Sequence, residues 1–197
     1  MNNQKKKIHN LVKIGVLGGL ATVLMLFQTP LPFAPPFYQM DLSELPVIIG
    51  GLAMGPVAGV LIELIKVLLN FVINGTITMG VGEMSNFIIG CAFVVPASVI
   101  YKKSHSKKGA ACGLIVGVGV MTVIGAISNA FVVLPAYSYF MHIDMSVLIN
   151  MGTKVNPMID GVWAFILFAV VPFNLLKGVL ITALTLLIYK KVRVILR

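Results

Sequence analysis

A single lysine, Lys177, lies in the stretch VVPFNLLKGVL, in the middle of a long apolar segment. Asn174 precedes it by three residues, so the two side chains share one face of a helix. Asn129 interrupts a second, very apolar segment. An amide both donates and accepts hydrogen bonds, whereas an ammonium group only donates. The three side chains together therefore suit a neutral ligand with carbonyl and imide-type edges.

An ionisable side chain in the core of a bilayer costs about 2.5–3.5 kcal/mol on the insertion scale, so each one needs an explanation. Glu63 and Lys66 are three residues apart and can neutralise each other, either as an ion pair that locks helix packing or as part of a binding site. Lys177 has no acidic residue within a turn on either side. Its alternative role is to pair with backbone carbonyls or with a carboxylate from another helix, such as Glu63 or Asp160.

The composition of the chain predicts that these polar residues lie in a membrane. Of the 197 residues, 58% are hydrophobic and 11% are charged, with a mean hydropathy of +1.01, whereas soluble domains are about 25% charged. The sequence thus predicts an all-α integral membrane protein with one transmembrane domain at 1–197. The second apolar segment is short, because about 20 residues normally span a bilayer. The apolar segments lie at residues 11–28, 45–53, 57–73, 84–101, 110–134 and 159–189.

Basic residues gather in three clusters next to apolar segments. Cytoplasmic loops of membrane proteins carry an excess of lysine and arginine, so the clusters predict a cytoplasmic loop at 102–108 and cytoplasmic chain ends. Six transmembrane helices satisfy this pattern with both termini in the cytoplasm, whereas five would put the last cluster on the wrong side. No basic surface interleaved with aromatic residues remains, and we expect no nucleic-acid partner. The clusters comprise Lys5, Lys6, Lys7, Lys13, Lys102, Lys103, Lys107, Lys108, Lys190, Lys191, Arg193 and Arg197.

The connections assigned to the outer face lie at 29–44, 74–83 and 137–158. The first contains TPLPFAPPFYQMD, residues 29–41, which we call the strap; its four prolines stiffen the backbone. The third connection is long for a structureless segment, and long ordered loops are usually functional. Loops of this kind can close over a site, although ordinary surface linkers also fit the sequence.

Motifs of several enzyme classes are absent from the sequence. No GxxxxGK[ST] phosphate-binding loop occurs, so we expect no ATP site in this chain. Neither an HExxH sequence nor a cluster of cysteine and histidine is present, and no Ser-His-Asp set has support. We therefore expect no metal, no resident cofactor and no enzymatic activity.

Several stretches of the sequence resemble one family of membrane transport subunits. They are PLPFAPPFYQMDLSELPVIIGGLAMGPVAGVLIELIKVLLN, GTITMGVGEMSNFIIG and VVPFNLLKG. Together they resemble the riboflavin-specific substrate-binding subunit (S component) of energy-coupling factor (ECF) transporters, over essentially the whole chain. LSELPV followed by GPVAG is typical of S components in general. NLLK and PFYQMDLSELP are typical of the riboflavin branch.

The resemblance implies six transmembrane helices in a bacterial cell membrane, with lipid around them and a vitamin site near the outer surface. It also implies partners, namely a membrane coupling subunit and two cytoplasmic ATPase subunits. Their ATP hydrolysis would topple the S component in the membrane and release the vitamin inside. S components dock on the coupling subunit through small residues of the first helix, for which Gly15, Gly19 and Ala21 are the candidates here.

The resemblance further implies that riboflavin is the ligand, bound as substrate, and flavin mononucleotide fits as well if its phosphate points to water. Lys177 would donate to a ring carbonyl or nitrogen. Asn174 and Asn129 would match the mixed donors and acceptors of the pyrimidine edge. Phe37 and Tyr38 would cover the apolar ring. The ribityl chain would meet the loops, where the candidate residues are Gln39, Met40, Asp41, Gly80, Gly82 and Glu83.

Two other functions fit the sequence. An S component for a different vitamin would have the same loops with other polar residues at membrane depth. A small stand-alone channel or structural membrane subunit would bind no ligand stoichiometrically and would not depend on an ATPase. The absorbance spectrum of the purified protein distinguishes these functions, because a bound flavin is yellow.

Overall fold

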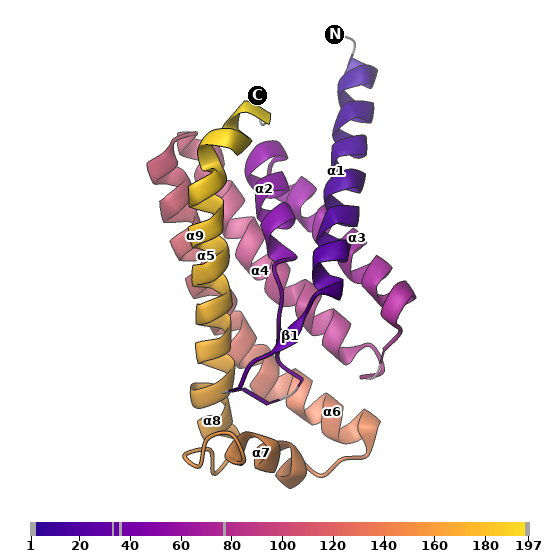
Figure 1. The fold of residues 1–197 in the computed structure, drawn as a ribbon, viewed down its shortest axis with the longest axis vertical. Coiled ribbons are helices and arrows are strands. Elements are labelled where there is room, and N and C mark those ends of the chain that lie inside the picture. Colours follow the sequence, from indigo (N-terminus) through magenta and orange to yellow (C-terminus); the bar gives the residue numbers. More distant parts are fainter. Residues whose placement is uncertain (1–2, 33, 36, 77, 196–197) are drawn as a thin grey trace.

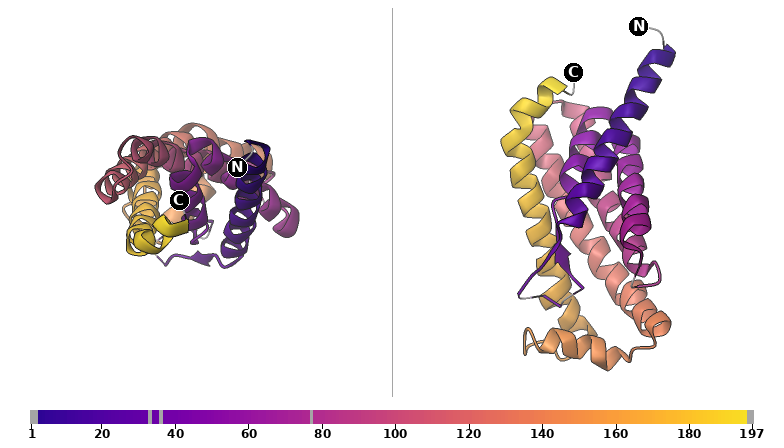
Figure 2. Two further views of the ribbon diagram at one scale, coloured as in Figure 1. Left: turned by 90° about the horizontal axis from the view of Figure 1, so that it is seen from above. Right: turned by 45° about the vertical axis from the view of Figure 1, so that its right-hand side comes forward.

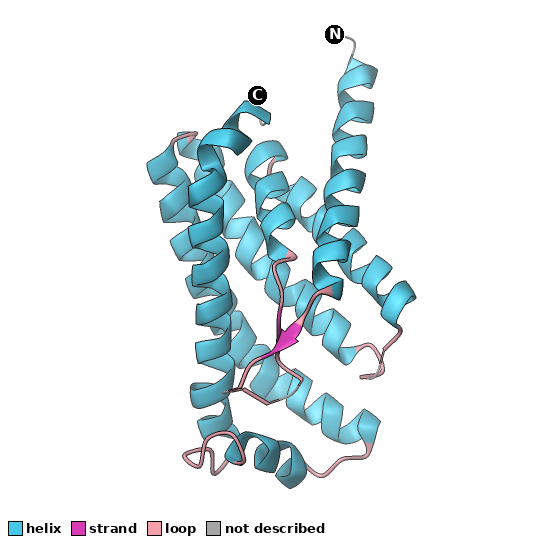
Figure 3. Ribbon diagram, in the orientation of Figure 1, coloured by secondary structure: helices cyan, strands magenta, loops and turns pink. Residues whose placement is uncertain are grey.

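The computed structural model describes residues 3–32, 34–35, 37–76 and 78–195. Within them the chain is almost entirely helical, and its one sheet is a pair of two-residue strands (Figure 3). Arg197, of the last basic cluster, lies outside the described residues. In chain order the elements are α1 (Asn3–Leu26), β1 (Thr29–Pro30), β2 (Gln39–Met40), α2 (Glu44–Met54), α3 (Pro56–Asn74), α4 (Val81–Ser104), α5 (Lys107–Ser128), the π-helical turn η1 (Asn129–Val133), α6 (Leu134–Met141), α7 (Met145–Thr153), α8 (Val162–Phe165), the π-helical turn η2 (Ile166–Val170) and α9 (Val171–Ile195).

The two chain ends lie at the same end of the helical bundle, and α6, α7 and α8 lie at the other (Figure 1). At the end that holds both termini, α1 extends beyond the rest of the bundle (Figure 2). The segment at 137–158, which the sequence predicts as a connection, contains α7 and most of α6. Pro135 lies just after the π-helical turn η1, inside the continuous helical segment Lys107–Met141, and lacks the N–H that a helix interior would otherwise use.

Five helical segments in the described part of the chain are long and apolar enough to cross a membrane. The apolar helix α2 has only 11 residues, so it is about 16 Å long against a hydrocarbon core of about 30 Å. A helix this short in a membrane needs protein around its ends. The five segments are Lys7–Leu26, Pro56–Asn74, Val81–Ser104, Lys107–Met141 and Val162–Tyr189.

A tight turn joins α2 to α3. Gly55 has a φ of 99°, in the region that residues with a Cβ rarely adopt. Its N–H donates to the carbonyl of Gly51 at 2.9 Å and so caps α2. Pro56 then begins α3, in the position where proline is best tolerated. The turn folds the short helix α2 back against α3.

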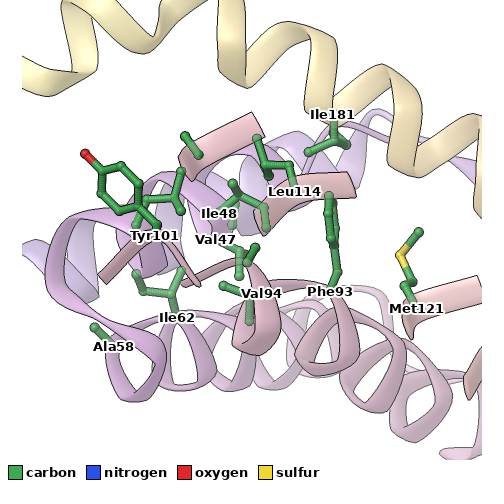
Figure 4. Packing of buried hydrophobic residues seen from close by; sticks show 14 of the residues in the cluster. Val47, Ile48, Ala58, Ile62, Phe93, Val94, Tyr101, Leu114, Met121 and Ile181 are labelled. Carbon is green, nitrogen blue, oxygen red and sulfur yellow. The ribbon is translucent and has the colours of Figure 1, made fainter. Parts of the chain in front are cut away.

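An apolar cluster that we call the first core joins α1, α2, α3, α4, α5 and α9 (Figure 4). Glycines let α4 and α5 touch through their backbones. A Cβ on Gly113 would lie 2.6 Å from the carbonyl oxygen of Ala97, and a Cβ on Gly117 would lie 2.7 Å from that of Phe93. A second core joins η1, α6, α7, α8 and η2, with rings of the strap packed against it.

The strap closes on itself as a small hairpin. Thr29 pairs with Met40 and Pro30 with Gln39 in an antiparallel register. Between these pairs the N–H of Tyr38 donates to the carbonyl of Pro35 at 2.9 Å, which makes a further turn. The strap thus begins at the end of α1 and returns to the start of α2, where it delivers Asp41 to the interior.

Candidate ligand-binding site

Lys177 lies on α9 and is almost completely buried, with 6% of its surface exposed. Its Nζ donates a hydrogen bond to Oδ2 of Asp41 at 3.1 Å and lies 3.8 Å from Oε1 of Glu44. The sequence indicates two other carboxylates, Glu63 and Asp160, as candidate partners of Lys177. Asp160 is exposed, and Glu63 forms its ion pair within α3. Two carboxylates at the junction of the strap and α2 therefore hold the lysine.

The buried charged residues form one group, which we call the charge network. Nζ of Lys66 lies 2.8 Å from Oε1 of Glu44 and 2.7 Å from Oε1 of Glu63, so the predicted pairing of Glu63 with Lys66 is confirmed. Glu44 is shared, because the same oxygen faces both lysines. A second oxygen of Glu44 is buried without a hydrogen-bond partner. The members of the charge network are Asp41, Glu44, Glu63, Lys66 and Lys177.

Asp41 is the member of the charge network that the strap contributes. Its Oδ1 accepts hydrogen bonds from the backbone N–H of Ser43, at 2.8 Å, and from the Ser43 hydroxyl. Its Oδ2 accepts from Lys177. Burial opposes ionisation of this carboxyl, but the two lysines of the network and the bonds from Ser43 outweigh burial and lower the pKa of Asp41 below its ordinary value of 3.8. Asp41 is therefore a carboxylate ion with both oxygens engaged.

The amides of Asn129 and Asn174 come together across two helical segments. Asn129 begins η1, and its Nδ2 donates to the carbonyl of Gly125 at 2.8 Å. Asn174 donates from Nδ2 to the carbonyl of Val170 at 2.9 Å. It also lies against Gly125, where a Cβ would be 2.9 Å from its Nδ2. The structure thus gathers the two buried amides around one glycine, one turn of α9 from Lys177.

Aromatic rings from the strap, α6, α8 and α9 gather beside Asn129. We call them the aromatic cluster, and its members are Phe37, Tyr38, Tyr137, Phe165 and Phe173. The Tyr38 hydroxyl donates to Oδ1 of Asn129 at 2.7 Å. The centroid of the Tyr38 ring lies 5.1 Å from that of Phe173 and 6.2 Å from that of Phe165. Phe37 stacks on Phe165 at 6.2 Å. Of the two strap residues that were predicted to cover a ligand ring, Tyr38 therefore contacts one of the amides and Phe37 packs against the neighbouring rings.

The Gly-rich connection before α4 borders the aromatic cluster. Oε2 of Glu83 accepts hydrogen bonds from the hydroxyls of Thr76, at 3.1 Å, and Thr78, at 3.2 Å. Oγ1 of Thr78 accepts from the N–H of Gly82 at 3.0 Å. A Cβ on Gly82 would lie 3.2 Å from the hydroxyl of Tyr137, whose ring belongs to the aromatic cluster.

The remaining loop candidates lie in β2 and in the turn before α4. Gln39 is half-buried and Met40 is buried, and together they form β2 immediately before Asp41. The Met40 carbonyl accepts a long hydrogen bond, 3.5 Å, from the hydroxyl of Thr29. Gly80 precedes α4 with a φ of 87°. These residues belong to the two loops, and none of the contacts of Asn129 and Asn174 described above involves them.

The expected docking residues lie on different faces of α1. A Cβ on Gly15 or Gly19 would meet no atom within 4 Å, so this face of α1 is open. Ala21, in contrast, is completely buried in the first core. Gly18 faces α3, where a Cβ would lie 2.5 Å from the Ile65 side chain. The structure therefore separates Ala21 from the open face that carries Gly15 and Gly19.

Sequence reasoning missed several residues of this region. Ser43 and Glu44 were not predicted at the site, and neither were three aromatic residues. A signal for Glu44 exists in the sequence: a buried lysine without a partner on its own helix needs a carboxylate elsewhere, and Glu44 directly precedes a short apolar segment. Nothing local distinguishes the three aromatic residues from other apolar residues of their helices; they are Tyr137, Phe165 and Phe173.

A family model described as "ECF transporter, substrate-specific component" matches residues 9–189 of the chain. The "Riboflavin transporter FmnP" of Bacillus subtilis (strain 168) is 35% identical over 188 residues, which cover 95% of this chain and 93% of that protein. The "Riboflavin transporter RibU" of Staphylococcus aureus (strain TCH60) is 33% identical over 193 residues, 97% of this chain and 93% of that one.

A solved structure described as "Structure and mechanism of the S component of a bacterial ECF transporter" shares the fold. Its TM-score is 0.74 at 31% sequence identity, and the match covers 97% of this chain and 99% of that chain. Family model, relatives and fold agree along almost the whole length. The chain therefore belongs to the substrate-specific components of ECF transporters, which are multi-pass membrane proteins.

Proposed function

We propose that this protein binds riboflavin as the substrate-specificity subunit of an ECF transporter in the bacterial cell membrane. Two relatives that are similar along nearly their whole length are riboflavin transporters. The observation that carries the proposal is the convergence of Asn129 and Asn174, one helical turn from Lys177 and beside the aromatic cluster.

The site matches the two halves of the flavin ring system. The flat apolar half can pack among the rings of the aromatic cluster, because aromatic pairs favour offset and edge-on contacts. The pyrimidine half has two carbonyls with an N–H between them, and Asn129 and Asn174 offer both donors and acceptors to it. Lys177 would donate to a ring carbonyl or nitrogen. A hydrogen bond from a charged donor is roughly twice as strong as a neutral one, so the lysine would contribute most.

A flavin would meet Tyr38 at Asn129 and would share or displace its hydrogen bond. In the structure the Tyr38 hydroxyl occupies the amide oxygen that a flavin N–H would use. Burial, together with the nearby Tyr137, raises the pKa of Tyr38, so the phenol keeps its proton and remains a donor. Once displaced, Tyr38 could cover the bound ring. The ribityl chain would extend toward the strap and Gly82–Glu83, and flavin mononucleotide would be admitted if its phosphate reached water.

Transport would depend on partner proteins. The open face of α1, with Gly15 and Gly19, would dock on a membrane coupling subunit, and two ATPase subunits would supply the energy for toppling. The proposal includes six crossings, the five long spans together with α2, with both termini in the cytoplasm. Two chain ends on the same side of the bundle support an even number of crossings (Figure 1).

Titration of the purified protein with riboflavin tests the function. Because stacking on aromatic rings quenches flavin fluorescence, we expect quenching that saturates at about one flavin per chain and a yellow protein. Thiamine and biotin serve as controls and should not compete. A colourless protein that does not quench flavin would contradict the proposal and would favour another vitamin or a structural membrane subunit.

Thiol labelling of intact cells tests the topology. In a chain without its native cysteines, Asn150→Cys should react with an impermeant reagent added outside, whereas His105→Cys should react only after lysis. Both positions are exposed on the folded chain, so burial does not confound the result. Labelling of residue 105 in intact cells would overturn the proposed orientation.

A further inference from the structure

The carboxylate of Asp41 is fixed at both of its oxygens. Oδ1 accepts from the backbone N–H and the hydroxyl of Ser43, and Oδ2 accepts from Nζ of Lys177 at 3.1 Å. Asp41 is 5% exposed, and Ser43, at the start of α2, is completely buried. Asp41 is one of the loop residues that the family resemblance implies near the ribityl chain. In the structure its oxygens face the protein.

Lys177 keeps donor capacity for a ligand while Asp41 holds it. An ammonium group has three N–H donors, and the structure shows one of them used by Asp41. Glu44 is 3.8 Å away, which is an ion pair without a hydrogen bond. Asn174 precedes Lys177 by one helical turn on the same face of α9, so the free donors share a face with one of the two buried amides.

We propose that Asp41 is a positioning residue, which fixes the ammonium group of Lys177 for the ligand and does not itself contact the ligand. This inference rests on the proposed flavin site. It assigns the chain of contacts from Ser43 through Asp41 to Lys177 a role in affinity, because a donor that is already oriented loses less freedom when the ligand binds.

Glu44 determines what happens when Asp41 is neutral. It is the nearest remaining carboxylate to Lys177, and its Oε2 is buried without a hydrogen-bond partner. In Asp41→Asn the buried ammonium group would therefore move toward Glu44 to regain a full ion pair. That movement turns the lysine toward α2 and leaves the ligand carbonyl without its charged donor.

A double-mutant cycle on riboflavin affinity tests the role of Asp41. In the wild-type background Asp41→Asn should weaken binding about tenfold, whereas in a Lys177→Met background it should change affinity by less than about twofold. Asp41→Glu keeps the charge and should recover part of the loss. Asp160→Asn, which removes an exposed carboxylate, is the matched control and should bind like wild type.

Equal losses from Asp41→Asn in both backgrounds would overturn the inference, because Asp41 would then act on the ligand directly or through the fold. Unchanged affinity in the wild-type background would overturn it as well. Ser43→Ala is the substitute test if Asp41→Asn does not fold, because it removes only the hydroxyl that donates to Oδ1 of Asp41. We expect Ser43→Ala to weaken riboflavin binding less than Asp41→Asn does, and to have no effect on affinity in the Lys177→Met background. Failure of the wild-type protein to bind riboflavin would instead refute the proposed function.

Discussion

In the first core, α4 and α5 touch through their backbones at Gly113 and Gly117. In the second core the space is filled by side chains, and the rings of Tyr137 and Phe165 pack against the strap. Backbones in contact have essentially one arrangement, because neither can move aside. Rings and amides have several arrangements, because side-chain torsions can change. We therefore expect the first core to hold the bundle together and the second core to be the part that can adapt to the proposed ligand.

The charge network lies where the two cores meet. Val170, the last residue of η2 before α9, belongs to the second core and Ile181 of α9 to the first, and Lys177 lies between them in the chain. The other lysine, Lys66, lies on α3, a helix that packs in the first core. One lysine therefore faces the proposed ligand and the other faces only carboxylates, which gives the two ends of the network different expected roles.

The largest effect on stability should come from Lys66→Met. This change leaves Glu44 and Glu63 buried without their shared counter-charge, and breaking a buried ion pair costs about 3–5 kcal/mol. We expect a large fall in the thermal unfolding temperature in detergent. The double variant Lys66→Met with Glu63→Gln should recover part of it. Equal unfolding temperatures for Lys66→Met and Lys177→Met would contradict the expectation that Lys66 contributes more to stability than Lys177 does.

The next effect concerns affinity. Lys177→Met removes a charged donor, so it should weaken riboflavin binding by about 10- to 150-fold, equivalent to about 1.5–3 kcal/mol. It should also lower stability, because Asp41 loses its ion-pair partner, but by less than Lys66→Met does, because Asp41 keeps its hydrogen bonds from Ser43 and Glu44 keeps Lys66. Equilibrium titration of flavin fluorescence measures the affinity.

Asn174→Leu is the companion variant on the same ligand edge. Its loss should be less than additive with that of Lys177→Met, because both side chains serve one ligand. Normal folding with unchanged affinity in Lys177→Met would leave this lysine as a purely structural partner of Asp41 and Glu44.

The sequence predicts the helical membrane architecture, because apolar segments carry that information locally, whereas the orientation that the basic clusters indicate stays a prediction. It also predicts Asn129, Asn174 and Lys177, since polar residues are conspicuous in apolar helices. It does not predict that Asp41 and Glu44 reach Lys177, because the contact joins residues 136 positions apart in the case of Asp41. The sequence does not predict the rings of Tyr137, Phe165 and Phe173 for the same reason, because only the fold brings them close to the strap.

The open face of α1 should affect uptake without affecting binding. A Cβ at Gly15 meets no atom within 4 Å, and the position is exposed, so with Gly15→Leu the isolated subunit should fold and bind flavin normally. Close helix approach to a coupling subunit would be blocked, and vitamin uptake by cells should fall several-fold. Gly18→Leu is the contrasting variant, because it collides with Ile65 and should lower stability. Parallel losses of binding and uptake in Gly15→Leu would place this face inside the fold.

The smallest effect should be an acid sensitivity that originates at the strap. The pKa of Asp41 lies below 3.8 in the folded chain and near that value when unfolded. Above this pH the carboxylate is ionised in both states and its stabilisation is complete. As the pH falls through 3.8, the unfolded chain takes up the proton first, and the stabilisation decreases until the folded carboxyl is protonated as well.

Thermal unfolding of Asp41→Asn and wild type at a series of pH values measures this contribution. The unfolding temperature of wild type should fall more steeply below pH 3.8 than that of Asp41→Asn, which has lost the titrating group. Asp160→Asn removes an exposed carboxylate instead and should keep the wild-type slope. An identical slope in Asp41→Asn would assign the acid sensitivity to other carboxylates. The strap would then be held to α9 by its packing against the aromatic cluster and not by charge.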